Sequence, residues 1–167
     1  MNEADLKIFS HFLGYFQKET DRGAALVGAA MIESRLERIL SLTLKDNSSK
    51  KDIFDGPNSL LGTFSSKIRL CHLLGFITEK EFTEINIIRK IRNEFAHKLD
   101  DMTFGNSPVC DHCMNLQANT PGDLKAKKDY RFLFINSVIF TSMALWYRPE
   151  HINQNFKLLD AAYNYQL

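Results

Sequence analysis

The stretch FLFINSVIFTSMALWY, residues 132–147, is the longest apolar run of the chain and decides the fold class that we expect. Polar side chains interrupt it only at Asn136, Ser137, Thr141 and Ser142. The run is shorter than the roughly 20 residues that a membrane span requires, so we interpret it as a core helix and expect no membrane association. A helix that is apolar on nearly all sides belongs at the centre of other helices.

The segments around this run also repeat at the helical period. Leu6, Phe9, Leu13 and Phe16 form one apolar stripe in a helix expected over about residues 3–18. The next helix begins with small residues, which permit close packing against a neighbouring helix. The further expected helices cover about residues 21–44, 60–74, 78–98, 129–147 and 149–164.

Local signals mark where several of these helices begin and end. Gly75 is a plausible C-terminal cap. Thr78 and Glu81 fit a capping box, and Pro149 suits the first turn of a last helix. Polar segments near residues 45–59 and 100–128 are predicted as loops. We therefore expect a single all-α domain over residues 1–167, built as one bundle of five or six helices.

The composition excludes several classes of protein. The chain has 167 residues, 44% hydrophobic residues and a formal net charge of +1. This argues against disorder and against non-specific binding of nucleic acid through a positive overall field. Three cysteines are too few for a disulfide scaffold. The acidic N-terminus lacks the apolar region of a secretory signal, so we expect a cytoplasmic protein.

The densest group of chemically useful residues is IIRKIRNEFAHK, residues 87–98, which has a local charge of +3. His97 can act as acid or base near neutral pH, Arg92 can grip a phosphate, and Asn93 lies four residues before His97 on the same helix face. Arg92 and His97 lie about 140° apart on an ideal helix. They converge only if the helix end distorts, Arg92 reaches round, or a second protomer completes the site. The candidate nucleic-acid contacts are Arg89, Lys90 and Lys98.

A solvated helix C-terminus is the alternative explanation of this group, since His97 and Lys98 would complement the helix dipole there.

Several stretches resemble the bacterial mannitol-operon repressor family. They are ETDRGAALVGAA (19–30) with Leu36 and Leu40, FSSKI (64–68), LGFI (74–77) and IRKIRNEFAH (88–97), with a weaker likeness over 130–151. Together they span about two thirds of the chain. The resemblance implies an all-helical protein that is grouped with transcriptional repressors.

The segment RNEFAH, residues 92–97, also resembles the motif of the HEPN superfamily of all-helical proteins, an Arg and a polar residue followed after three residues by His. Many members are metal-independent endoribonucleases with the site at a dimer interface. The resemblance implies that Arg92 would hold the scissile phosphate, that His97 would assist proton transfer during attack by the RNA 2′-hydroxyl, and that Asn93 would orient the pair. Other members are inactive binding modules, so the motif leaves activity open.

Direct DNA binding is a further alternative, because residues 64–92 are ordered as helix, glycine turn and helix. The N-terminal residues of the second helix would face the major groove. Glu79, Glu81 and Glu84 among them would oppose phosphates, and the same helix needs Phe82 and Ile85 for the core. We therefore expect no direct sequence-specific DNA binding.

Two other motifs have mainly structural explanations. Cys110 and Cys113, with His112 between them, provide half of a zinc-site spacing, but a structural zinc needs four ligands. We therefore expect free thiols, no metal and no cofactor, and a zinc site shared between two protomers is the alternative. Asp21 and Arg22 are expected as a local ion pair or as part of an internal polar network.

Two classes of function remain. We favour a non-enzymatic bacterial regulator of transcription, homodimeric and acting through a protein partner, because the first resemblance covers more of the chain. The alternative is a ribonuclease, a toxin or defence effector that would bind RNA and use Arg92 and His97. This alternative requires Arg92, Asn93 and His97 in one exposed cleft, and a His97 sealed in the core would exclude it.

Overall fold

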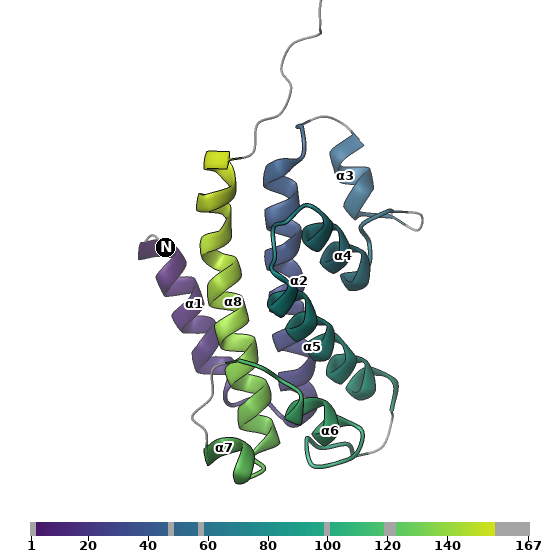
Figure 1. Cartoon of the computed structure of the whole chain (residues 1–167), viewed down its shortest axis with the longest axis vertical. Coiled ribbons are helices and arrows are strands. Elements are labelled where there is room, and N and C mark those ends of the chain that lie inside the picture. Colours follow the sequence, from purple (N-terminus) through teal and green to yellow (C-terminus); the bar gives the residue numbers. More distant parts are fainter. Residues whose placement is uncertain (1–2, 47–48, 57–58, 99–100, 119–122, 156–167) are drawn as a thin grey trace, which may run out of the picture.

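The computed structural model describes residues 3–46, 49–56, 59–98, 101–118 and 123–155, and each regular element in these ranges is an α-helix (Figure 1). The expected all-α fold class is confirmed. The helices are α1 (Glu3–Phe16), α2 (Asp21–Thr43), α3 (Ser49–Phe54), α4 (Phe64–Leu73), α5 (Glu79–His97), α6 (Val109–Met114), α7 (Asp123–Ala126) and α8 (Tyr130–Asn155).

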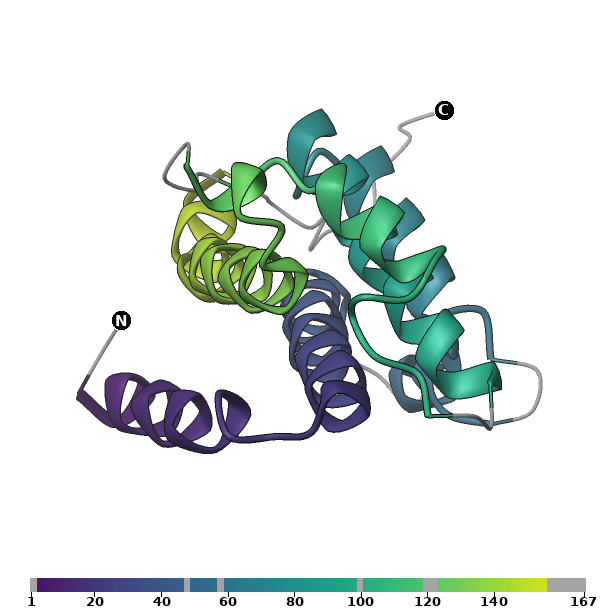
Figure 2. The ribbon, with the colours of Figure 1, turned by 90° about the horizontal axis from the view of Figure 1, so that it is seen from below.

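Helices α2 and α8 lie side by side at the centre, with α1 on one side and α4 to α6 on the other (Figures 1 and 2). The small residues of α2 permit this contact. A Cβ atom on Gly28 would lie 3.1 Å from the Phe16 ring and 3.1 Å from Val138 of α8. Ala24, Ala25 and Gly28 of this segment are all buried. A larger side chain at residue 28 would therefore push α2 away from both neighbours.

Helix α1 contacts the core through a stripe slightly different from the expected one. Phe9 and Phe16 are buried as predicted, but Leu6 is 56% exposed. Phe12 stacks on Phe16 instead, with ring centroids 5.0 Å apart, and Phe9 meets Trp146 of α8 at 5.5 Å. Aromatic side chains thus dominate the attachment of α1.

The helix ends around residue 75 follow the local signals. The Phe76 amide donates to the Cys71 carbonyl at 2.8 Å and the Gly75 amide to the His72 carbonyl at 3.0 Å. This is a Schellman motif, and Gly75 occupies its left-handed position with φ of +70°. Thr78 and Glu81 form the expected capping box at the start of α5. Helix α4 begins only at Phe64, where Thr63 and Ser66 form another capping box.

The expected helix boundary at Pro149 is wrong. Helix α8 continues from Tyr130 to Asn155 with Pro149 inside it. Proline removes one helical hydrogen bond and crowds the preceding turn. Buried side chains on both sides of it, Leu145 and Ile152, hold the helix together across that position. The remainder of the expected last helix, residues 156–164, lies outside the described residues.

The two predicted loop regions contain short helices. Helix α3 lies within residues 45–59, and α6 and α7 lie within residues 100–128. The second region also closes one end of the core, since Phe104 lies 5.0 Å from Phe95 and 5.1 Å from Phe134 between ring centroids. Helices of four to six residues are too short to show a period in the sequence.

No helix within the described ranges is both long enough and apolar enough to cross a membrane.

Candidate functional site

The C-terminal end of α5 is held by Arg22 of α2. Its guanidinium donates from Nη1 to the Phe95 carbonyl at 2.6 Å and from Nη2 to the Lys98 carbonyl at 2.8 Å. The last carbonyls of a helix lack intrahelical partners and carry negative partial charge, so a cation stabilises them. Arg22 therefore fixes the position of the segment that contains the HEPN-like motif.

Asp21 belongs to a second, connected network, which supports an internal polar network over a purely local pair. Its carboxylate accepts from Arg131 Nη1 at 2.7 Å and from the Phe104 amide at 3.1 Å. Arg131 also donates to the carbonyls of Gln17 and Glu19. The sequence analysis missed Arg131, because its partners lie more than 100 residues away along the chain.

Arg92 and Asn93 form a contact of their own at the end of α5. Arg92 Nη1 donates to Asn93 Oδ1 at 3.1 Å, and both side chains are half-buried. His97 is exposed, and within the described residues no hydrogen bond joins it to Asn93. Because α5 stays α-helical to His97, Arg92 lies beside the buried face while His97 lies on the opposite side, about 140° away. The catalytic grouping of these three residues stays a prediction.

The three candidate nucleic-acid contacts differ in their surroundings. Arg89 is half-buried and donates to Asn86 at 3.4 Å. Lys90 is exposed, whereas Lys98 pairs with Glu94 at 3.3 Å. The described geometry therefore leaves Lys90 as the least engaged cation of the three.

Glu84 is a buried carboxylate that the sequence analysis treated only as a possible surface charge. Its Oε1 accepts from the Ala118 amide at 3.0 Å and from Ser137 Oγ at 2.6 Å, and its Oε2 accepts from the Gln117 amide at 2.7 Å. The side chain thereby ties α5 to α8 and to the segment after α6. A buried carboxylate with three donors is satisfied and acts as an anchor.

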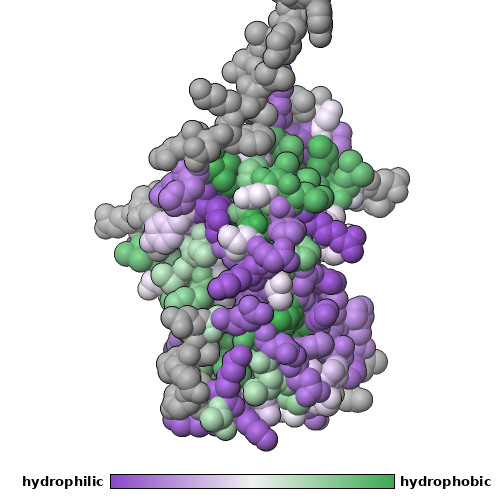
Figure 3. All heavy atoms as spheres, viewed as in Figure 1, coloured by the Kyte–Doolittle hydropathy of each residue, from purple (hydrophilic) through white to green (hydrophobic). Residues whose placement is uncertain are grey.

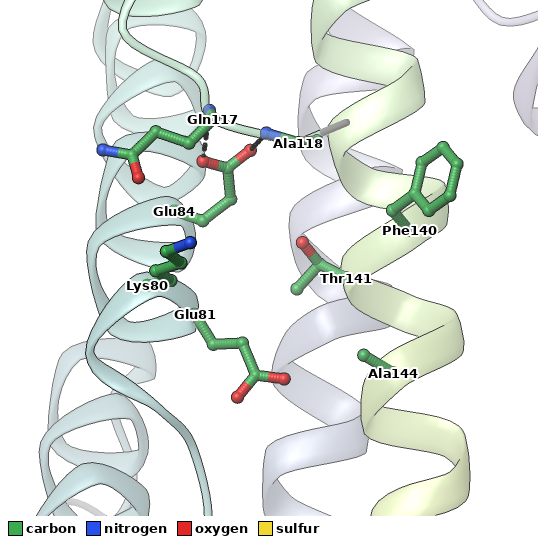
Figure 4. A pocket seen from close by; sticks show the side chains of 8 residues that line it. All are labelled: Lys80, Glu81, Glu84, Gln117, Ala118, Phe140, Thr141 and Ala144. Atoms are coloured by element: carbon green, nitrogen blue, oxygen red, sulfur yellow. Dashed lines mark hydrogen bonds between the residues drawn. The ribbon is translucent and has the colours of Figure 1, made fainter. Parts of the chain in front are cut away.

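A cavity of about 180 Å³ opens beside this anchor, between α5 and α8 (Figure 4). Thr141 and Ala144 face α5 across it, while the Phe140 ring points away from α5. Glu81 at its edge pairs with Arg148, so neither Glu81 nor Glu84 is free to face DNA. The lining residues are Lys80, Glu81, Glu84, Gln117, Ala118, Phe140, Thr141 and Ala144.

Lys67 of α4 is buried against two carboxylates of α2. Its ammonium lies 3.0 Å from Glu33 Oε1 and 2.7 Å from Glu37 Oε2. Burial alone would lower the pKa of Lys67, but the hydrogen bonds to Glu37 and Glu33 together raise it above its usual value. Glu33 and Glu37 therefore both serve the α2–α4 interface, and the Glu37 side chain remains 44% exposed.

A wider groove of about 460 Å³ lies at the other end of the molecule, where α4 meets α3 and the end of α2. Figure 3 shows strongly apolar surface there. Leu60 is 79% exposed and Leu73 is 81% exposed, the highest values among the large apolar side chains in the described ranges. Arg69 is exposed on the groove wall and has no hydrogen bond or ion pair within those ranges. The remaining lining residues are Leu44, Ile53, Leu61, Thr63, Ser65, Ser66 and Leu70.

The cysteines of the half zinc motif are free thiols in different surroundings. Cys113 is fully buried, and burial together with the neighbouring Cys110 raises the pKa of its thiol to about 12. Cys110 is only half-buried. In the described part of the chain, no three side chains among His, Cys, Asp and Glu lie together in a way that suits a metal ion.

Taken together, the fold and these surfaces of the described residues define an all-α protein with an apolar groove at one end. The fold resembles that of MtlR in the X-ray structure of the MtlR–HPr complex from Escherichia coli. The TM-score is 0.61 at 16% sequence identity, and the match covers 82% of this chain and 97% of that chain. At this identity the likeness establishes the fold.

No protein-family model matches the sequence, and no curated protein matches it either.

Proposed function

We propose that this chain is a regulatory protein of the mannitol-operon repressor type that acts by binding a protein partner of the HPr type. The observation that carries the proposal is the likeness to MtlR over 97% of that chain, in a structure that contains HPr as its partner. The stretches that resemble the mannitol-operon repressor family support it independently, and the proposal places this chain in that family.

Action through a protein partner fits the N-terminal half of α5 better than direct reading of DNA. A recognition helix needs its first residues free to reach base edges. Here Glu81 is engaged with Thr78 and Arg148, and Glu84 is buried. We therefore assign any role in transcription to contacts with other proteins.

The groove where α4 meets α3 and the end of α2, called the α4 groove from here on, is the surface that suits such a partner best. Exposed large apolar side chains gathered in one patch mark interaction sites more often than scattered ones do. Leu60 and Leu73 would be covered by apolar side chains of the partner, and Arg69 would pair with a carboxylate beside them. A guanidinium in that setting binds a carboxylate through two parallel hydrogen bonds.

The test is isothermal titration of the full chain with the HPr of the organism that encodes it, with Escherichia coli HPr alongside. Leu73→Glu and Arg69→Glu should each weaken binding by about tenfold or more, because they remove an anchor or reverse a charge. Tyr15→Glu, a matched change at an exposed residue of α1, should leave the affinity unchanged. Equal affinities of the wild type and the three variants for HPr would show that the α4 groove is not the HPr-binding surface.

The ribonuclease function is a second candidate, favoured by the Arg92–Asn93 contact and by the exposure of His97. Its test is cleavage of a panel of single-stranded RNAs in EDTA. Cleavage with 2′,3′-cyclic ends that His97→Ala abolishes and His11→Ala preserves would establish it. The control is informative because His11 is also an exposed histidine. If the folded wild-type chain cleaves none of the RNAs, the ribonuclease candidate is rejected and the regulatory function remains.

A further inference from the structure

One side of α8 carries large apolar side chains that the described part of the chain covers only partly. Phe132, Phe140, Met143 and Tyr147 are 41%, 48%, 37% and 38% exposed. On an ideal helix these four residues and Asn136 fall within an arc of about 80°, along a length of about 22 Å. We call this set of five residues the α8 stripe. Figure 3 shows pale green apolar surface over this part of α8.

The sequence analysis expected α8 to be surrounded by other helices, and the stripe shows where that expectation fails. The opposite side of α8 is buried against α2, with Phe134 and Val138 fully inaccessible. A contiguous apolar stripe on a helix that is otherwise buried is typical of a surface that another helix covers.

We propose that the α8 stripe is the interface between two copies of this chain, packed antiparallel about a two-fold axis near Phe140. The stripe has the same order of side chains from either end: an aromatic residue at 132, a smaller one at 136, an aromatic residue at 140, a smaller one at 143 and an aromatic residue at 147. A two-fold interface requires such self-complementarity, because the same surface is used by both copies.

The two-fold relation sets specific pairs of residues against each other. Phe132 meets Tyr147 of the second copy, Asn136 meets Met143, and Phe140 lies beside Ile139 and Phe140 across the axis. Each copy therefore contributes to aromatic pairs at both ends and at the centre, and each such pair adds to the energy of apolar burial. Parallel packing would instead place each side chain of the stripe against the residue of the same number in the second copy.

The charges around the stripe permit this contact. The cations at its two ends are already paired within one chain, Arg131 with Asp21 and Arg148 with Glu81. The exposed members of the stripe carry no ionisable group that is charged near neutral pH. A formal net charge of +1 adds little repulsion between two copies.

The exposed area of the stripe limits the size of the contact. Aromatic side chains of this size offer about 150–250 Å² each, so the exposed parts of the stripe supply roughly 300 Å² per copy. A standard interface buries about 800 Å² per partner, of which the apolar core is only a part. The stripe therefore supplies less than half of the area that one partner of a standard interface buries, and we expect a weak dimer with a dissociation constant no tighter than micromolar.

The first test is the mass of the full chain by sedimentation equilibrium over about 1–200 μM, a range that spans the expected dissociation constant. The wild-type mass should rise toward twice 19.2 kDa. Phe140→Glu should keep the mass of a single chain throughout, while Leu73→Glu in the α4 groove should behave as the wild type does. A wild-type chain that stays monomeric at the highest concentration overturns the proposal, and so does dissociation by Leu73→Glu alone.

The second test measures the orientation with engineered cysteines under mild oxidation. The double variant Phe132→Cys/Tyr147→Cys should form covalent dimers, because these positions are about 22 Å apart in one chain and adjacent across the axis. Phe132→Cys alone should not. Rapid cross-linking of Phe132→Cys alone would show parallel packing and overturn the arrangement. Cys110, the half-buried native thiol, is replaced by Ser in all variants.

These tests contain no HPr, so their outcome is separate from that of the proposed function. If the wild-type chain is monomeric and Phe140→Glu abolishes HPr binding, the α8 stripe binds HPr and not a second copy of the chain. The dimer is then rejected.

Discussion

Lys67 is the charged residue whose surroundings constrain the fold most strongly. Its side chain is only 7% exposed and contacts Glu33 and Glu37. Lys67→Met would leave two neighbouring carboxylates without their shared cation, although Glu37 retains contact with water. We expect a loss of about 2 kcal/mol in the free energy of unfolding, measured by urea denaturation.

The control is Lys50→Met, because Lys50 also pairs with a carboxylate, Asp46, whose side chain is 95% exposed. Surface pairs of this kind contribute little, so the loss should stay under about 0.5 kcal/mol. Equal losses for the two variants would contradict the role given to Lys67.

The pKa of Lys67 also predicts a dependence of stability on pH. Its pKa in the folded chain is raised above the usual 10.5, so the stability it contributes is fully present below pH 10.5. That stability is lost as the pH rises through the higher folded value. The difference in unfolding free energy between wild type and Lys67→Met should therefore stay constant from neutral pH to about 10 and then shrink. If this difference in unfolding free energy grows at alkaline pH, the pKa of Lys67 is lowered in the folded chain and not raised.

The three cysteines should differ in reactivity for a related reason. Burial raises the pKa values of Cys71 and Cys113 to about 12, with Cys110 adding to the effect at Cys113, so neither thiol ionises near neutral pH. Thiolates, not thiols, attack disulfide reagents. Ellman's reagent should modify one thiol of the native chain quickly, and Cys110→Ser should remove that fast phase. Fast modification of two or more thiols would show that Cys71 or Cys113 is not buried as described.

At the scale of elements, Glu84 holds together the contact of α5, α6 and α8. One of its three donors comes from α8 and two come from the segment after α6, and all lie more than 30 residues away in the sequence. Glu84→Gln keeps the shape but presents an amide N–H₂ to backbone donors, which should cost about 2 kcal/mol of unfolding free energy.

The matched control is Glu79→Gln on the same helix, where the side chain is 77% exposed and the change should stay within about 0.5 kcal/mol. Thermal or urea unfolding of the two variants gives the comparison. A Glu84→Gln protein as stable as wild type would mean that these hydrogen bonds add nothing to the packing of α5 on α8.

The helices were predictable where their signals are local. Thr78 and Glu81 are three residues apart, and Gly75 ends α4 through bonds within its own turn, so short windows of sequence suffice. Pro149 misled the prediction, because the packing of Leu145 and Ile152 outweighs the missing hydrogen bond. The partners of Glu84, Lys67 and Arg131 could not be predicted, since each depends on the way distant helices meet.

At the scale of the whole molecule, the two proposed contact surfaces lie on different elements. The α8 stripe would bind a second copy, and the α4 groove would bind a protein of the HPr type. Phe140→Glu should therefore abolish dimers while preserving HPr binding per chain, and Leu73→Glu should do the reverse. Sedimentation and calorimetry on the same two variants measure this pair of effects. A folded variant that loses both dimer formation and HPr binding would show that the two contacts use the same surface.

Packing along α8 also bears on the ribonuclease candidate. Arg92 and His97 lie near the C-terminal end of α5, and the α8 stripe contains neither residue. A dimer through the stripe is therefore not built on the motif, whereas the HEPN arrangement places the motif at the dimer interface. Arg22 of α2 binds the carbonyls of Phe95 and Lys98 and so anchors the helix end that carries the motif.

The central claim is that this chain recognises a protein of the HPr type, and calorimetric titration of the wild-type chain with its own organism's HPr tests it most directly. We predict saturable binding with one HPr per chain and a dissociation constant on the order of micromolar, as expected for an interface of modest size. Absence of any saturable signal, from a chain shown by its helical circular dichroism to be folded, would contradict the claim.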